Sequence, residues 1–164
     1  MLTSHELFGF MSPALSHQIL EDAYTGEREL YKATLTAVAN ARKLRPVFLE
    51  RQPRTERHVT MVTALGKPAQ ELIAANLIRG WLLKKQNAVL RDFLDALGIV
   101  HKEGAVEDLP ETMDDEKLKA GVDKLLATHP KETAIVYLHA FNGMNDQAWK
   151  NLNELLQNDP RLQF

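Results

Sequence analysis

The sequence predicts an all-α protein, a helical bundle of about six to seven helices around one long central helix (about 68–97), with a C-terminal helical hairpin. Apolar residues recur three and four positions apart, which places them on one face of a helix. Proline, glycine and short polar residues divide the chain at intervals that suit helices, and runs of alternating β-branched residues are nearly absent.

The first two predicted helices are separated by Gly26. Ser12 followed by Pro13 predicts a helix start, because the hydroxyl can cap free N–H groups and proline needs no donor at the first helical position. We expect this helix to end near Tyr24. A second helix is predicted over residues 27–44, where apolar residues recur at helical spacing on one buried face.

Residues 45–54 are predicted to form a connector, because prolines stand near both of its ends. Thr55 is a suitable cap for a short helix that ends at Leu65. Gly66 is then expected to end that helix in the left-handed conformation.

The long central helix is predicted to open at Pro68 and to end at Leu97. One apolar stripe is interrupted by polar residues, while a second stripe runs along the first half of the helix with Gly80 in its middle. A helix with two apolar sides is typical of a bundle centre or of pairing with another chain. We therefore expect a homodimer that pairs through this second stripe. Its residues are Ile73, Leu77, Gly80 and Trp81.

The C-terminal part is predicted to follow a helix end at Gly98, closed by a Schellman turn. Residues 99–109 form either a small β-hairpin or a loop, and the loop is favoured. Asp114, Asp115 and Glu116 suit the start of the next helix, since its dipole favours carboxylates there. Pro130 ends that helix, and residues 133–141 and 146–158 are predicted to pair as the hairpin.

This pattern predicts three segments: an N-terminal bundle (1–98), a connector loop (99–113) and a C-terminal three-helix lobe (114–164), together forming one compact domain. The chain has no cysteine, which excludes disulfides, thiolate nucleophiles and sulfur-ligated metal centres. No apolar run approaches the roughly 20 residues that cross a bilayer, and the N-terminus lacks the basic start of a signal peptide. We therefore expect a cytoplasmic protein with no membrane partner.

Charge is distributed unevenly along the chain. Residues 1–100 hold 13 Lys and Arg against 10 Asp and Glu, whereas residues 101–164 hold 7 against 12. Six permanent cations fall within residues 42–58, and they are Arg42, Lys43, Arg45, Arg51, Arg54 and Arg57. They form a candidate polyanion-binding set, with nucleic acid as one partner. Two observations argue against nucleic-acid binding. The pI of the whole chain is near 6.3, and Phe48 is the one aromatic residue among these cations that could stack on a base.

The six histidines are scattered singly, and no two of them fall at the spacing that places paired metal ligands on one helical face. The nearest candidate pair is His17 with Glu21, one helical turn apart, which is usually a surface interaction. The sequence therefore predicts no metal site and no cofactor. Nucleotide-binding and nucleophile-elbow motifs are also absent.

An enzyme is the third class to weigh, because Tyr137, His139 and Asn142 lie within two turns of a predicted helix. Residues so placed are more often core and cap, so the sequence predicts no catalytic residues. The favoured hypothesis is a non-catalytic helical interaction or scaffold module that self-associates and has a further protein partner. In it, the arginine-rich connector and the acidic C-terminal part are complementary surfaces. Nucleic-acid binding is the alternative.

Overall fold

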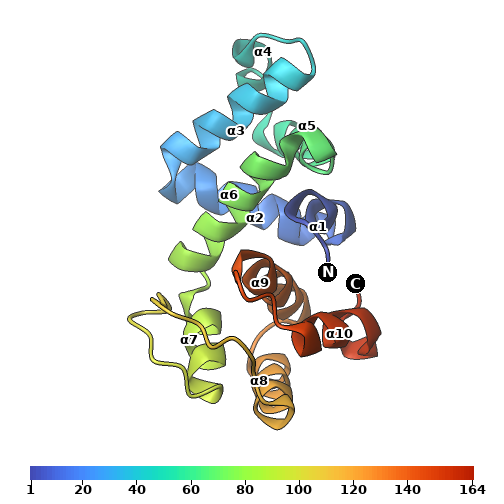
Figure 1. Ribbon diagram of the computed structural model, residues 1–164. Helices are drawn as coiled ribbons and strands as arrows, with labels where there is room; N and C mark the ends of the chain where they lie inside the picture. The colour runs from blue at the N-terminus through green and yellow to red at the C-terminus, as the bar shows by residue number, and fades with distance from the viewer. The chain divides into compact units, whose positions relative to one another are not determined.

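The computed structural model describes all 164 residues, and its secondary structure consists of ten α-helices and two short 3-10 helices without any strand (Figure 1). This confirms the predicted all-α class, whereas the expected number of six to seven helices was too low. The α-helices are α1 (Ser4–Phe10), α2 (Pro13–Gly26), α3 (Arg28–Ala41), α4 (Pro46–Glu50), α5 (Arg54–Leu65), α6 (Glu71–Lys84), α7 (Asn87–Ala96), α8 (Asp115–Thr128), α9 (Lys131–Met144) and α10 (Lys150–Asn158). The 3-10 helices are η1 (Pro68–Gln70) and η2 (Pro160–Leu162).

The chain divides into two compact units. The N-terminal unit comprises Leu2–Trp81, and the C-terminal unit comprises Leu82–Phe164 together with Met1. The division therefore falls inside α6, whereas the sequence placed its first boundary at residue 98.

The N-terminal unit is built around contacts among α2, α3 and α5. Each of these helices packs on the other two, and α1 and α4 add to α5 and α3 at the edges. The core contains Ile19 and Leu20 from α2, Leu35 and Val38 from α3 and Met61 from α5, all nearly inaccessible to solvent. Ser12 caps α2, because its Oγ accepts a hydrogen bond from the N–H of Leu15 at 3.2 Å, as the sequence predicted.

The single long helix predicted over 68–97 is wrong. The segment is η1 followed by two α-helices, and Lys85 and Gln86 separate α6 from α7. The break contains neither proline nor glycine, so no local signal marked it. A tertiary contact accompanies it, since the side chain of Asn87 donates a hydrogen bond to the carbonyl of Glu103 at 2.7 Å.

Smaller expectations in the N-terminal unit are also corrected. The segment 45–54 contains the helix α4, and α5 begins at Arg54 with Pro53 rather than Thr55 in the cap position. Gly66 has a φ of −73° and is not left-handed. Helix α1 was not predicted, although Thr3 and Glu6 form a capping box, which is a sequence signal for the start of a helix.

The C-terminal unit pairs α7 with α8 and places α9 against α7, α8 and α10. Gly98 ends α7 with φ of +70°, and the N–H groups of Gly98 and Ile99 bond to the carbonyls of Asp95 and Leu94, which confirms the Schellman turn. Asp114 caps α8 by accepting from the N–H of Lys117 at 3.0 Å.

Residues 99–109 form a loop with one tight turn, where Lys102 and Ala105 make a single bridge. The favoured loop is therefore confirmed. Among all the helices, none combines the length and the apolar character needed to cross a bilayer.

Candidate functional site

The six predicted polyanion-binding residues separate into two groups in the structure. Arg42, Lys43, Arg45 and Arg51 are exposed, and none of them makes a salt bridge or a side-chain hydrogen bond. They surround the end of α3 and the short helix α4, which lie at the top of the N-terminal unit in Figure 1. Four cations without acidic partners leave a net positive field at this end of the unit.

Apolar side chains are exposed among these cations. Leu44, Val47 and Phe48 have 40%, 38% and 52% of their surface accessible, while Leu49 of the same helix is buried. We call the exposed set of four cations and three apolar residues the basic tip. A surface that mixes arginine, lysine, an aromatic ring and aliphatic groups is suited to a partner with both negative charge and apolar contacts.

Lys43 is held in an unusual backbone conformation within the basic tip. Its φ is +56°, and the N–H groups of Lys43 and Leu44 bond to the carbonyls of Asn40 and Ala39. This is the turn that ends a helix with a left-handed residue, a position that glycine usually occupies. The left-handed conformation of Lys43 ends α3 and turns the backbone toward the start of α4.

Arg54 and Arg57, the other two predicted residues, have partners inside the unit. Arg57 donates to the carbonyls of Leu49 (3.0 Å), Glu50 (2.8 Å) and Gln52 (3.2 Å), and so holds the connection between α4 and α5. Arg54 forms a salt bridge with Glu21 at 2.7 Å and lies over the ring of Tyr24. These two arginines therefore stabilise the fold beside the basic tip.

A polar network lies beneath these arginines, centred on the buried His58 of α5. Nε2 of His58 lies 2.8 Å from the hydroxyl of Tyr31 on α3, and that hydroxyl also accepts from Arg57 at 3.2 Å. Burial is the main cause that lowers the pKa of His58 to about 4, and the electrostatic effects of the neighbouring His17, Arg57 and Arg54 lower it further. The imidazole is therefore neutral near pH 7.

His17 and Glu21 of α2 complete this network. Nδ1 of His58 lies 3.1 Å from Nδ1 of His17 and 3.7 Å from Oε2 of Glu21. One ligand atom from each of the three residues fits within 4.8 Å of the other two. We call these three residues the histidine cluster. The turn spacing of His17 and Glu21 was recognised in the sequence, but nothing local indicated that His58 would join them.

A pocket of about 290 Å³ opens on the surface next to this network. Tyr31 and Arg57 form part of its wall. Glu50 also lines it, and this residue lies at the end of α4, the helix that carries Val47 and Phe48 of the basic tip. Its eight lining residues are Tyr24, Arg28, Tyr31, Lys32, Leu35, Thr36, Glu50 and Arg57. Three cations against one carboxylate favour an anionic group in this pocket.

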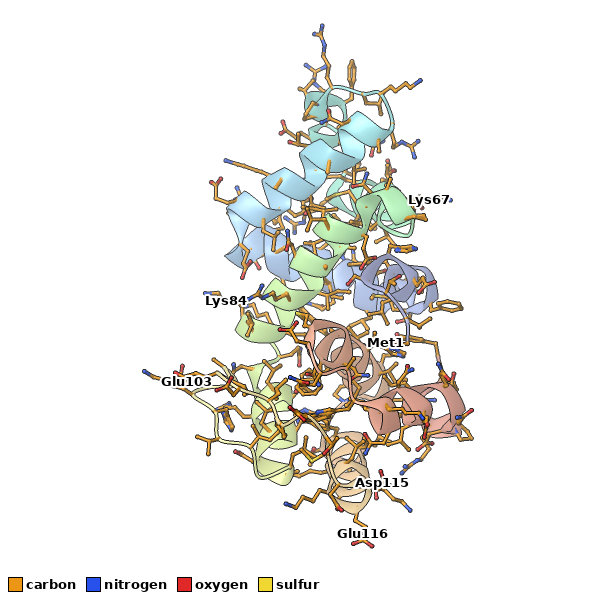
Figure 2. The ribbon with its side chains drawn as sticks, in the orientation of Figure 1. Met1, Lys67, Lys84, Glu103, Asp115 and Glu116 are labelled. Atoms are coloured by element: carbon orange, nitrogen blue, oxygen red, sulfur yellow. The ribbon has the colours of Figure 1, made fainter.

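The C-terminal unit carries the opposite charge in one stretch. Residues 107–116 contain Glu107, Asp108, Glu111, Asp114, Asp115 and Glu116, all exposed, and no basic residue. We call this stretch the acidic segment. Figure 2 labels Asp115 and Glu116 in the first turn of α8, where Glu116 projects outward and the carboxylate of Asp115 accepts a hydrogen bond from the side chain of Asn151 at 2.8 Å.

The residues predicted for self-association pack within their own chain. Leu77 and Trp81 are 1% and 4% exposed, and the indole N–H of Trp81 donates to Asp22 at 3.1 Å. A Cβ built on Gly80 would lie 2.9 Å from Glu27 Oε2, so this glycine allows close packing between α6 and the start of α3. Ile73 is half-buried. Most of the second stripe is therefore buried by contacts within the same chain.

The polar residues weighed for catalysis lie in the interior of the C-terminal unit. Tyr137, His139 and Asn142 are all buried on α9. Burial raises the pKa of Tyr137, whose hydroxyl has no hydrogen-bond partner, and Asn142 donates to the carbonyl of Trp149 at 3.3 Å.

Comparisons with protein families, with curated proteins and with solved structures found no match for this chain. The functional argument therefore depends on the geometry and chemistry of these residues.

Proposed function

We propose that this chain is a non-catalytic interaction module that self-associates, with the basic tip of one copy binding the acidic segment of a second copy. The observation that carries this proposal is the basic tip, where four cations without partners surround three exposed apolar side chains. The acidic segment offers six exposed carboxylates in ten residues. Complementary charge of this kind steers association and fixes its orientation.

The route of self-association differs from the one inferred from the sequence. Because Leu77 and Trp81 are buried in their own chain, they are not free to pair with another copy. The basic tip needs no rearrangement to meet a partner. Leu44, Val47 and Phe48 then supply apolar area, while the cations supply attraction that depends on salt.

Light scattering over a range of protein concentrations tests this proposal at low and at high salt. We expect a dimer at low salt that dissociates as salt increases, because exposed charges are screened within roughly 8–10 Å at physiological ionic strength. The double variant Arg45→Glu/Arg51→Glu should remain monomeric under both conditions. The matched control Lys84→Glu/Lys85→Glu makes the same change of net charge at exposed residues outside the tip, and it should dimerise like the wild type. A wild-type monomer at low salt would refute self-association.

Nucleic acid is the second candidate partner, because Phe48 is exposed among the cations and can stack on a base. The aliphatic side chains of Leu44 and Val47 have no counterpart in such a complex, so a protein surface is favoured. A gel-shift titration with single-stranded DNA at low salt distinguishes the two partners. A salt-dependent shift that is lost in Arg45→Glu/Arg51→Glu would favour nucleic acid.

A further inference from the structure

The histidine cluster has the chemistry of a metal site. Two imidazoles and one carboxylate are the ligand types that zinc and other first-row divalent ions take in proteins, with solvent in the remaining positions. His17 and Glu21 stand one turn apart on α2, and α5 brings His58 against them. No other group of three or more His, Asp or Glu side chains in the structure meets at such distances.

The distances within the histidine cluster suit one small cation. Ligand atoms about 2.0–2.2 Å from a tetrahedral zinc ion lie roughly 3.3–3.5 Å from one another. The nitrogen of His58 lies 3.1 Å from that of His17 and 3.7 Å from the oxygen of Glu21. Small side-chain rotations would therefore bring the three atoms around a common centre.

The carboxylate of Glu21 provides a second, independent indication. Its Oε1 pairs with Arg54, but its Oε2 is buried and has no hydrogen-bond partner. A buried carboxylate oxygen without a partner is costly, because its lost hydration is not replaced. A cation between Oε2 and the two imidazoles would supply the missing interaction.

The surroundings of the cluster hold its ligands in position. His58 is 1% exposed, and its Nε2 faces the hydroxyl of Tyr31, which Arg57 fixes from the other side. Metal-bound histidines commonly donate their second N–H to such an acceptor, which leaves the other nitrogen free to bind. We propose that His17, Glu21 and His58 bind one divalent first-row transition ion, with Tyr31 orienting His58.

The other histidines provide matched controls. His5, His101 and His129 each pair with a single carboxylate, at 2.7, 2.6 and 2.7 Å, without a third ligand. A metal that binds histidine–carboxylate pairs indiscriminately would bind these as well as the cluster. His129→Gln removes such a pair from the C-terminal unit and leaves the cluster intact.

Equilibrium dialysis of the full chain against Zn²⁺, followed by elemental analysis, tests the proposal. We expect one ion per chain in the wild type and in His129→Gln. His17→Gln and Glu21→Gln each remove one ligand from a half-buried position, so we expect affinity to fall by at least about tenfold. Circular dichroism confirms that each variant is folded.

Absorption of the Co²⁺-loaded protein gives a second readout, since visible bands report the ligand field directly. We expect bands in the wild type that change in His17→Gln and Glu21→Gln and persist in His129→Gln. The proposal is overturned if the wild type binds none of Zn²⁺, Co²⁺ and Ni²⁺, or if the two cluster variants bind as the wild type does. Loss of the ion in His129→Gln alone would assign it to an ordinary surface pair and would also overturn the proposal.

Discussion

At Lys43, the effect of backbone strain on stability can be measured separately from the effect of the side-chain charge. An L-residue in the left-handed region costs roughly 1 kcal/mol relative to glycine, because its Cβ approaches the backbone. Its φ of +56° places it there at the end of α3. We therefore expect Lys43→Gly to raise the free energy of unfolding by up to about 1 kcal/mol.

Urea denaturation of Lys43→Gly beside Lys43→Ala measures this effect. Alanine removes the same charge but keeps the Cβ, so its stability should remain near that of the wild type. Both variants should weaken self-association equally, because both remove one cation from the basic tip. If Lys43→Ala stabilises the protein as much as Lys43→Gly, charge repulsion rather than backbone strain is the cause.

His58 shows why the histidine cluster was only partly predictable. A helix of 3.6 residues per turn puts His17 and Glu21 on one face, and this follows from the sequence alone. His58 reaches them only because α5 packs against α2, and no periodicity specifies that crossing. Tyr31, from α3, lies 27 residues before His58 in the chain. Local spacing therefore predicts the pair but not the third ligand.

At the scale of elements, helix starts and ends were predictable where a side chain or glycine acts locally. Ser12 and Gly98 have the predicted roles, because each acts through hydrogen bonds within a few residues. Asp114 stands at the helix start predicted for it, and its side chain also caps that helix. The break between α6 and α7 was not predictable in this way. Its residues are compatible with a continuous helix, and Asn87 instead bonds to the distant loop at Glu103.

The contact between α7 and α8 depends on Gly121. A Cβ at this position would lie 3.3 Å from Cδ2 of Leu97 and 3.3 Å from two ring atoms of Phe93. Gly121→Val would therefore force these buried side chains apart. We expect a loss of about 1–3 kcal/mol in the free energy of unfolding, as is typical of overpacked cores.

Thermal and urea unfolding of Gly121→Val are compared with Ala120→Val on the exposed face of the same helix. Ala120→Val also places a β-branched valine in the helix, but its side chain does not crowd Leu97 and Phe93. If the two variants unfold alike, α7 and α8 do not depend on a small residue at their contact.

At the scale of the whole molecule, a net charge of −2 conceals two surfaces of opposite sign. The basic tip belongs to the N-terminal unit and the acidic segment to the C-terminal unit. A symmetric dimer would use each surface once per copy, so two identical contacts would form. This reciprocity makes the proposed association testable by exchanging charges between copies.

Two charge-reversed variants provide that exchange. The first variant, Arg42→Glu/Arg45→Glu/Arg51→Glu, leaves one cation against three carboxylates in the tip, so its tip and its segment are both negative. The second variant, Glu107→Lys/Asp108→Lys/Glu111→Lys/Glu116→Lys, leaves two carboxylates against four cations in the segment, so its segment and its tip are both positive. Each variant alone should be monomeric, because its two surfaces repel. When the two are mixed, every contact again joins opposite charges, so we expect heterodimers by light scattering at low salt and their loss at high salt. A mixture that remains monomeric would show that the tip and the segment do not meet.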